Sequence, residues 1–191
     1  MSEPAQVCYS TFSSPVGELL LTASDGMLTE LSMVLKQGRP ALYPKPEWRR
    51  DDAALRTARE QLEAFFAGEL QNFNLPLRMT GTPFQKQVWQ GLLEIPYGTT
   101  ISYATLATQI GRPGASRAVG AANGRNPIGI IVPCHRVIGA DGTLTGYGGG
   151  LDRKEWLISH EASVVAREHA RAEPGERLQV KNNKHKLKQL V

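Results

Sequence analysis

The sequence has few cysteines and few histidines, and both shortages exclude classes of site. Its 191 residues include two cysteines, Cys8 and Cys134, and no histidine precedes His135. Two distant cysteines exclude a disulfide scaffold and suit a reducing compartment. Residues 1–133 therefore cannot supply the nitrogen and sulfur ligands of a structural zinc site. We expect no metal ion and no cofactor.

Long hydrophobic runs are also missing. No stretch approaches the ~18 consecutive apolar residues that a membrane-spanning helix requires, so we expect no membrane contact. The first residues, Met1–Gln6, contain neither the basic nor the apolar region of a signal peptide. With 41% hydrophobic and 21% charged residues, the composition is typical of a globular protein with one or two small domains. These absences predict a cytoplasmic location.

Net charge is absent from most of the chain and gathers at its C-terminal end. Residues 163–191 carry seven Lys or Arg against three Glu, while residues 1–162 carry fifteen residues of each sign. A basic segment of this kind favours an interaction with nucleic acid. Because the same segment is polar and contains Pro174-Gly175, we expect a flexible basic tail over 163–191 rather than a specific binding arm.

The first part of the chain predicts a small α/β domain over residues 1–78. Short apolar runs at 7–12, 19–22 and 27–35 are separated by turn-forming residues, of which Asp25-Gly26 is typical of a hairpin. We therefore expect a small antiparallel sheet. Apolar residues then recur at helical spacing from Leu55 to Phe66 and end at Gly68, which predicts one helix.

Residues 79–162 predict a second, mostly helical domain. Thr82 and Gln85 have the spacing of a capping box, with Pro83 at the first helical position. Two short helices follow, one beginning after Ser102 and one over about residues 115–123, joined by a glycine-containing turn. This pattern is typical of a helix-turn-helix.

One short stretch, Pro133-Cys134-His135-Arg136-Val137, carries the clearest chemistry. It follows an apolar run, Ile130–Val132, that we expect to form a buried strand. Thiolate is the reactive form of cysteine and nearby basic groups favour it, so we expect the pKa of Cys134 to lie below that of a free thiol. His135 can take the proton, directly or through a water. A lone cysteine beside a strand is more often a small buried hydrophobe, but the flanking Pro and His-Arg residues favour a nucleophile.

The same stretch resembles the active-site motif of the O6-alkylguanine-DNA alkyltransferases, also called methylated-DNA–protein-cysteine methyltransferases. The resemblance is dense from Gly81 to Glu161 and weaker before that range. Its motifs in this chain are Gly81-Thr82-Pro83-Phe84-Gln85, Ile95-Pro96-Tyr97-Gly98, Ser116-Arg117-Ala118-Val119-Gly120, Asn126-Pro127, Gly146-Tyr147-Gly148-Gly149-Gly150 and Arg153-Lys154-Glu155-Trp156-Leu157.

The resemblance implies a catalytic set around the cysteine. Cys134 would be the nucleophile, because displacement at an sp³ carbon calls for a soft, strong nucleophile such as thiolate. His135 would hold its proton, and Glu161 would orient the histidine. Asn126 would brace the turn beside the cysteine.

The resemblance also implies how a damaged base reaches the thiol. The O6 atom of guanine lies inside the duplex stack, so the nucleotide has to be flipped out, in this family from the minor groove. Arg117 would enter the stack and fill the space that the base leaves, a role that suits a long planar cation. The same helix would bring further residues close to DNA, namely Ser116, Ala118, Ala121, Ala122 and Asn123.

A substrate pocket follows from the same resemblance. Tyr103 would crowd the rotating phosphate and bind the flipped guanine. The loop Tyr147, Gly148 and Gly149 would close over the base and bond O6 through backbone N–H groups, and Val137 would join the pocket. Some relatives have a serine at the position of Gly148, so no hydroxyl contribution is expected there.

The sequence therefore predicts a DNA-repair protein that acts once. It would transfer an alkyl group from O6-alkylguanine, and from O4-alkylthymine, in double-stranded DNA to its own Cys134. We expect a monomer, with or without cooperative binding on DNA, associated with the nucleoid. The alternative is a non-catalytic module that binds alkyl lesions and flags them for other repair factors. A helix-turn-helix regulator is disfavoured, because such proteins read the major groove with longer polar side chains.

Overall fold

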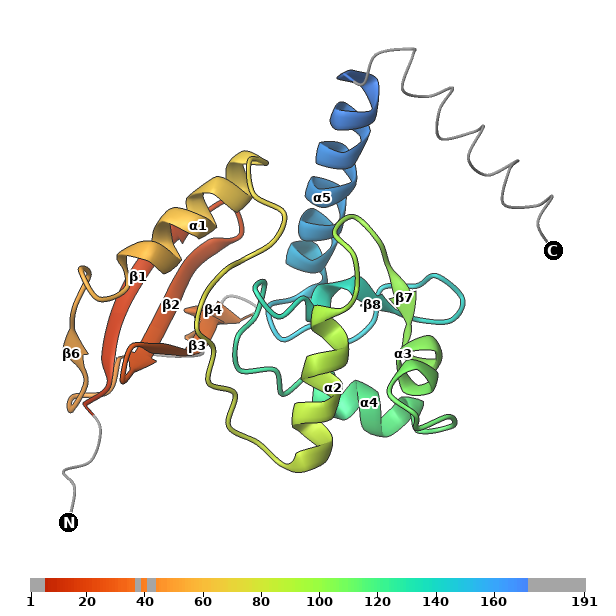
Figure 1. Cartoon of the computed structure of the whole chain (residues 1–191), viewed down its shortest axis with the longest axis horizontal. Coiled ribbons are helices and arrows are strands. Elements are labelled where there is room, and N and C mark those ends of the chain that lie inside the picture. Colours follow the sequence, from red (N-terminus) through yellow and green to blue (C-terminus); the bar gives the residue numbers. More distant parts are fainter. Residues whose placement is uncertain (1–5, 37–38, 41–43, 172–191) are drawn as a thin grey trace, which may run out of the picture.

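The computed structural model describes residues 6–36, 39–40 and 44–171 (Figure 1). Its N-terminal sheet has the strand order β3-β2-β1-β6. The strands β1 (Cys8–Ser14), β2 (Gly17–Ser24) and β3 (Met27–Met33) pair antiparallel, and β6 (Arg49–Arg50) pairs parallel to β1. A separate ribbon joins β4 (Leu35–Lys36) to β5 (Arg39–Pro40). The predicted α/β domain is confirmed, with a mixed sheet instead of a purely antiparallel one.

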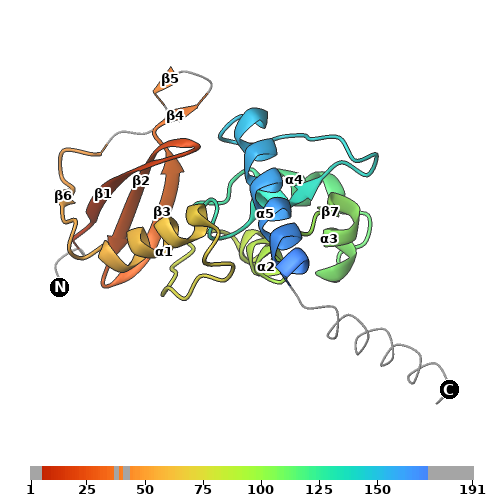
Figure 2. The ribbon, with the colours of Figure 1, turned by 90° about the horizontal axis from the view of Figure 1, so that it is seen from above.

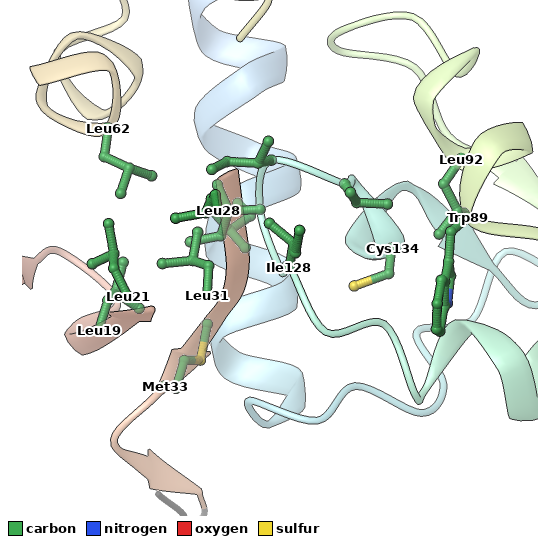
Figure 3. Close-up of a cluster of buried hydrophobic side chains, with 14 of the residues drawn as sticks. Leu19, Leu21, Leu28, Leu31, Met33, Leu62, Trp89, Leu92, Ile128 and Cys134 are labelled. Atoms are coloured by element: carbon green, nitrogen blue, oxygen red, sulfur yellow. The ribbon is translucent and has the colours of Figure 1, made fainter. Parts of the chain in front are cut away.

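The helix α1 (Arg56–Ala67) lies across one face of this sheet (Figure 1). It ends at Gly68, whose φ of +76° is a left-handed conformation that glycine adopts without steric cost. Leu62 of α1 is fully buried and faces Leu19 and Leu21 of β2 (Figure 3). The apolar residues whose spacing predicted this helix therefore lie on the face that covers the sheet.

The second domain is mostly helical, as predicted. Its helices are α2 (Pro83–Leu93), α3 (Tyr103–Gln109), α4 (Ser116–Asn123) and α5 (Leu151–Arg171), with a short parallel pair, β7 (Ile101–Ser102) and β8 (Val137–Ile138). The capping box of α2 is present, since Thr82 Oγ1 accepts from Gln85 N at 3.2 Å and Gln85 Oε1 accepts from Thr82 N at 2.8 Å. Figure 2 shows the sheet and α1 on one side of the molecule and α2 to α5 on the other.

The helix α5 extends beyond the boundary expected from the sequence. The predicted flexible tail began at residue 163, but residues 163–171 continue the helix. The reason is that its buried stripe continues to Val164, which is 2% exposed and lies against Gly68 at the end of α1. The prediction of a flexible tail is therefore wrong for 163–171, and residues 172–191 lie outside the described residues. No helix among the described residues has the length and hydropathy needed to cross a bilayer.

The outer edge of β3 joins the two domains. Leu28 N donates to Pro76 O at 2.8 Å, in the connection between the domains. Further along the strand, Leu31 N donates to Pro127 O and Leu31 O accepts from Gly129 N, each at 2.9 Å. A strand edge with unpaired backbone groups invites pairing, and here the segment that leads to Cys134 provides it. The active-site segment is thus hydrogen-bonded to the N-terminal sheet.

Aromatic packing around Phe65 is a second link between the domains. The fully buried Phe65 ring contacts the rings of Phe66, Phe73, Tyr97 and His160, with centroids 5.3 to 6.0 Å apart. His160 on α5 also hydrogen-bonds to Phe65 O at 2.8 Å. One side chain of α1 therefore packs on the connection, on the loop after α2 and on α5.

We predict that Phe65→Ala lowers the free energy of unfolding by about 3–5 kcal/mol, the usual cost of truncating a buried phenylalanine. The neighbouring Phe66→Ala is the matched control, and because Phe66 is only half-buried its loss should be clearly smaller. Urea denaturation followed by circular dichroism measures both. Equal losses would show that Phe65 does not link the domains in this way.

Candidate active site

Two tight turns present the cysteine. Pro133 has φ −81° and ψ 64°, and Cys134 N donates to Val132 O at 2.8 Å, which together make an inverse γ-turn with proline at its centre. Cys134 then begins a short 3-10 helix, η1 (Cys134–Arg136). The apolar run before it is buried as expected. The prediction that this run is a strand is wrong, because Ile130 and Ile131 lie in turns and Val132 in a bend.

Ile130, within the first of these turns, has a strained backbone. Its φ is +68°, and Ile131 N donates to Gly129 O across it at 2.8 Å. A β-branched residue in this region is uncommon and costs on the order of 1–3 kcal/mol. The residue is 2% exposed, so packing holds it there. Such strain is often found beside functional groups, and here it lies four residues before the candidate nucleophile.

A buried carboxylate organises the residues that follow Cys134. Glu161 on α5 is 1% exposed and lies 2.8 Å from His135 Nε2. Its oxygens also accept from Arg136 Nε and Nη2, each at 2.9 Å, and from Gly98 N at 2.9 Å. Arg136 Nη1 in turn donates to Ile95 O at 2.7 Å. The hydrogen bonds that Glu161 accepts all stabilise the ionised form of its carboxylate.

The titration of this cluster follows from burial and charge. Burial raises the pKa of the Glu161 carboxyl, but hydrogen bonds and charge from His135 and Arg136 outweigh it and bring the pKa to about 2. Burial lowers the pKa of His135, with Glu161 opposing that effect. His135 is therefore neutral at pH 7. We assign its proton to Nε2, because that atom faces a carboxylate, which leaves the lone pair on Nδ1.

His135 Nδ1 is the atom that can act as a base. It is buried and makes no hydrogen bond within the described part of the chain. A buried polar nitrogen without a partner costs free energy and is a common sign of a catalytic role. Glu161 thus fixes the orientation and the tautomer of the imidazole next to Cys134. The other ring nitrogen, Nδ1, is left as a free acceptor.

The cysteine itself differs from the sequence-based expectation in its acidity. Burial raises the pKa of the Cys134 thiol, while the Asn126 side chain, the Lys154 charge and the backbone N–H groups of Cys134 and His135 lower it less strongly. The predicted pKa below that of a free thiol is therefore wrong for this structure. Only 7% of Cys134 is exposed, and desolvation disfavours the thiolate. The thiol consequently keeps its proton until a base removes it.

Two asparagines hold the turn around the cysteine. Asn126 Nδ2 donates to Val132 O at 2.7 Å, and its Oδ1 accepts from Ile128 N at 3.0 Å, which places it as the brace that the sequence predicts. Asn123 Nδ2 donates to Cys134 O at 3.3 Å. Asn123 was expected to contact DNA, but its side chain is buried beside the nucleophile. That prediction is wrong, because α4 turns this residue toward the core.

Lys154 is a site residue that sequence reasoning did not single out. Its side chain is fully buried, and Nζ donates to Val137 O at 2.6 Å and to Thr145 O at 2.7 Å. It also lies 5.9 Å from the centre of the Tyr103 ring. A sequence signal existed, since Lys154 and Glu161 occupy the same buried stripe of α5 as Leu157 and Val164. Charged residues at core positions of an amphipathic helix are unusual and point to function.

Cys134 lines a cavity of about 60 Å³ between the two domains. The loop Tyr147–Gly149 forms one side, and Asn123, Gly124 and Asn126 form another. In Figure 3 the sulfur of Cys134 points toward the side on which Ile128, Leu31 and Met33 lie. The structure thus brings Cys134, Asn126 and the predicted loop together. Val137, in contrast, is fully buried in β8 and does not line this cavity.

A wider cleft adjoins the cavity. It is lined by Tyr103, Ser116, Arg117, Gly120 and Thr145, and it shares Gly124, Gly146, Tyr147 and Gly148 with the cavity of Cys134.

The exposed face of α4 borders this cleft and contains Arg117, Ala118 and Ala121. Ala122 is 2% exposed, and its carbonyl accepts from Trp89 Nε1 at 2.9 Å. The predicted contact of Ala122 with DNA is therefore wrong, because that residue packs on α2.

Fold and site together define a class of protein. A helix-turn-helix lies beside a cleft that leads to a buried cysteine, and a His–Glu pair stands behind that cysteine. This combination is typical of a cysteine-dependent transferase with a DNA-binding motif.

Comparison with known proteins agrees with this class. Residues 83–163 match the sequence model of the 6-O-methylguanine DNA methyltransferase DNA binding domain, and residues 7–79 match that of its ribonuclease-like domain. The chain belongs to the 6-O-methylguanine DNA methyltransferase family. The predicted family, fold class and enzyme class, methylated-DNA–protein-cysteine methyltransferase, are confirmed, and with them a role in DNA binding and DNA repair.

Several relatives are similar over most of their length. The methylated-DNA–protein-cysteine methyltransferase of Mycobacterium tuberculosis is 53% identical over 155 residues, covering 81% of this chain and 92% of the relative. That of Methanosarcina acetivorans is 50% identical over 155 residues, covering 81% and 98%. The crystal structure of Mycobacterium tuberculosis OGT in complex with DNA is similar with a TM-score of 0.76 at 52% identity, covering 82% of this chain and 94% of that one.

We predict that Glu161→Gln removes part of the acid sensitivity of the fold. A carboxyl whose pKa falls on folding stabilises the protein above its unfolded pKa and loses that contribution as the pH falls through the folded value. Folding lowers the pKa of Glu161 from the ordinary 4.5 to about 2. At 1.36 kcal/mol per pKa unit, the ionised carboxylate therefore contributes about 3 kcal/mol to the free energy of unfolding. About half of this contribution should disappear between pH 5 and pH 3 in the wild-type protein and the rest as the pH falls through about 2, and all of it should be missing in the variant.

Urea unfolding at both pH values measures this difference. Glu155→Gln is the control, since Glu155 is exposed on the same helix and should keep the wild-type pH dependence. At pH 7 the Glu161 variant should itself be less stable by about 3–5 kcal/mol, because Arg136 is left as a buried, unpaired charge. An unchanged pH dependence in Glu161→Gln would contradict the role given to this carboxylate.

Proposed function

We propose that this protein repairs DNA by moving an alkyl group from O6 of a flipped guanine to Sγ of Cys134, once per protein molecule. The observation that carries the proposal is the position of Cys134, which lines a cavity next to the helix-turn-helix cleft with His135 and Glu161 behind it. O4-alkylthymine presents an alkyl group on a comparable oxygen, so we include it among the substrates. Because the target is chromosomal DNA, we expect the protein at the nucleoid.

The path of the base supports flipping as the way in. Arg117 and Tyr103 line the outer cleft, and the cleft leads past Gly124 and Tyr147 to the cavity of Cys134. The exposed residues of α4 next to Arg117 are Ala118 and Ala121, whose small side chains allow the helix backbone to approach the minor groove closely. Arg117 then fills the space in the stack that the base leaves, and stacking suits its planar guanidinium.

The chemical step balances without a cofactor. The Cys134 thiol gives its proton to His135 Nδ1, directly or through a water, and the imidazolium is stabilised by Glu161. The thiolate attacks the alkyl carbon, so an S–C bond forms while the C–O6 bond breaks. The electron pair of that bond leaves on the guanine, where backbone N–H groups of the loop Tyr147–Gly149 stabilise it. The net transfer of the Cys134 proton, by way of His135, leaves a neutral guanine and a neutral imidazole, and Cys134 remains as a thioether.

The raised thiol pKa fits a protein that acts once. A thioether has no easy route back to thiolate, so a cysteine that reacts with any small electrophile is lost. Burial keeps Cys134 protonated, and a thiol is a far weaker nucleophile than a thiolate. The proton is removed by a base that is already in place. All the residues of this site come from one chain, so a monomer suffices.

The rival function is a binding module that recognises the lesion without repairing it. Such a module would need the cleft and α4 but neither a nucleophile nor a base. The buried Cys134 with an unpaired His135 Nδ1 beside it therefore favours transfer over binding alone.

We predict that incubation with excess O6-methylguanine duplex raises the intact mass of the protein by one methyl group and no more. Peptide mapping should place the group on Cys134. Cys8 serves as an internal control, because it is also buried and its Sγ donates to Ala23 O at 3.5 Å within the sheet. Cys134→Ser should bind the DNA without gaining mass, since a hydroxyl is much harder to ionise. Methyl groups on Cys8, or repeated turnover by one molecule, would refute the mechanism.

We predict that Arg117→Ala slows repair of duplex DNA far more than transfer from free O6-benzylguanine. Unstacking a base costs a few kcal/mol, and a free base avoids that cost. Arg112→Ala is the matched control, because Arg112 is equally exposed but lies outside the cleft. Single-turnover rate constants with both substrates give the ratio. A similar loss on both substrates would argue against a role for Arg117 in flipping.

A further inference from the structure

The N-terminal domain supplies one wall of the cavity that holds Cys134. Leu19 of β2 and Leu31, Ser32 and Met33 of β3 line it opposite the loop that carries Tyr147. The hydrogen bonds of Leu31 with Pro127 O and Gly129 N connect this wall to the segment before the nucleophile. The distance from the wall to Cys134 is therefore set by backbone pairing and not by side chains alone.

Met33 is the part of this wall that reaches the substrate loop. A Cβ placed on Gly149 would overlap with Met33 Sδ and lie 2.9 Å from Met33 Cε and from Tyr147 Cε1. The Met33 side chain thus lies directly against the backbone of the loop proposed to close over the base. It is 7% exposed, so its methyl group is held inside the molecule.

The geometry of displacement brings the alkyl group to this wall. The thiolate must approach the alkyl carbon from the side opposite O6, so any substituent on that carbon projects sideways into the cavity. A methyl group has only hydrogens there. A larger group needs additional room beside Cys134, and that room is bounded by the residues that line the cavity. Its aliphatic lining on the N-terminal side consists of Leu19, Leu31 and Met33.

We propose that Met33, a residue of the N-terminal domain, determines the size of the alkyl group that Cys134 accepts. This proposal rests on the proposed function and names one of its specificity determinants. Methionine suits the position because its unbranched thioether side chain adapts to irregular space. Leu19 and Leu31 are less able to yield, since they are branched and only 1% and 2% exposed, against 7% for Met33. Met33 is therefore the flexible boundary of the alkyl subsite.

The proposal predicts opposite effects for smaller and larger side chains. Met33→Ala removes the wall and should raise the rate of benzyl transfer relative to methyl transfer about tenfold, a typical effect of altering an apolar pocket by a few atoms. Met33→Phe fills the space and should lower the same ratio. Met33→Leu keeps nearly the same volume and should stay close to the wild-type ratio. A merely structural role would slow both transfers equally and leave the ratio unchanged.

The experiment uses the full chain and one duplex sequence that carries either O6-methylguanine or O6-benzylguanine. Single-turnover rate constants are measured from intact mass, and thermal unfolding of each variant confirms that it is folded. Met27→Ala is the matched control, because Met27 begins the same strand but does not line the cavity. Its ratio should equal that of the wild type.

The possible outcomes distinguish the role of Met33 from the proposed function itself. A ratio that rises in Met33→Ala and falls in Met33→Phe supports it. A ratio unchanged in both variants, while methyl transfer continues, overturns the role of Met33 and leaves the repair function intact. If Met33→Ala does not fold, an unchanged ratio in Met33→Phe is sufficient to overturn it. Absence of any transfer by the wild-type protein overturns the proposed function and this inference with it.

Discussion

The buried carboxylate of Glu161 is the interaction on which the rest of the site depends. Removing a carboxylate from water costs several kcal/mol, and only several well-aligned donors offset that cost. Glu161 has them in His135, Arg136 and the Gly98 backbone. These donors come from η1 and from the loop after α2, and Glu161 itself belongs to α5, so one charge draws three elements together. The same charge sets the tautomer of His135, whose Nδ1 has no hydrogen-bond partner among the described residues.

A second constraint comes from the edge of the N-terminal sheet. The segment Pro127–Gly129 pairs with Leu31 of β3, so the turns before Cys134 have a rigid support. That support allows Ile130 to keep a positive φ, and it makes the cavity a joint product of both domains. The N-terminal domain therefore lines the cavity of Cys134, through the wall that contains Met33.

Burial has two consequences for the nucleophile that act in opposite directions. It raises the thiol pKa, and a protonated thiol is a weaker nucleophile than a thiolate. It also removes water, which strengthens the effect of each charge and dipole in the site. Lys154 and Asn126 lower the thiol pKa from inside the same dry region. The reactivity of Cys134 is thus held back by desolvation and released by groups that are already in position.

The sequence by itself determined the local structure and the chemistry. Periodicity, turn residues and caps gave the strands, α1, the start of α2 and the helix-turn-helix, because these depend on neighbours along the chain. The motif around Cys134 identified the family and indicated a candidate nucleophile and its partners by residue type: a thiol, an imidazole and a carboxylate.

Only the tertiary structure decided three further points. It replaced the expected strand before Cys134 by turns, since pairing with β3 determines that backbone. It buried Ala122 and Asn123, since the packing of α4 on α2 selects which face remains exposed. It raised the pKa of Cys134 and revealed Lys154 and Met33, because desolvation and contacts between domains depend on residues that are distant in sequence.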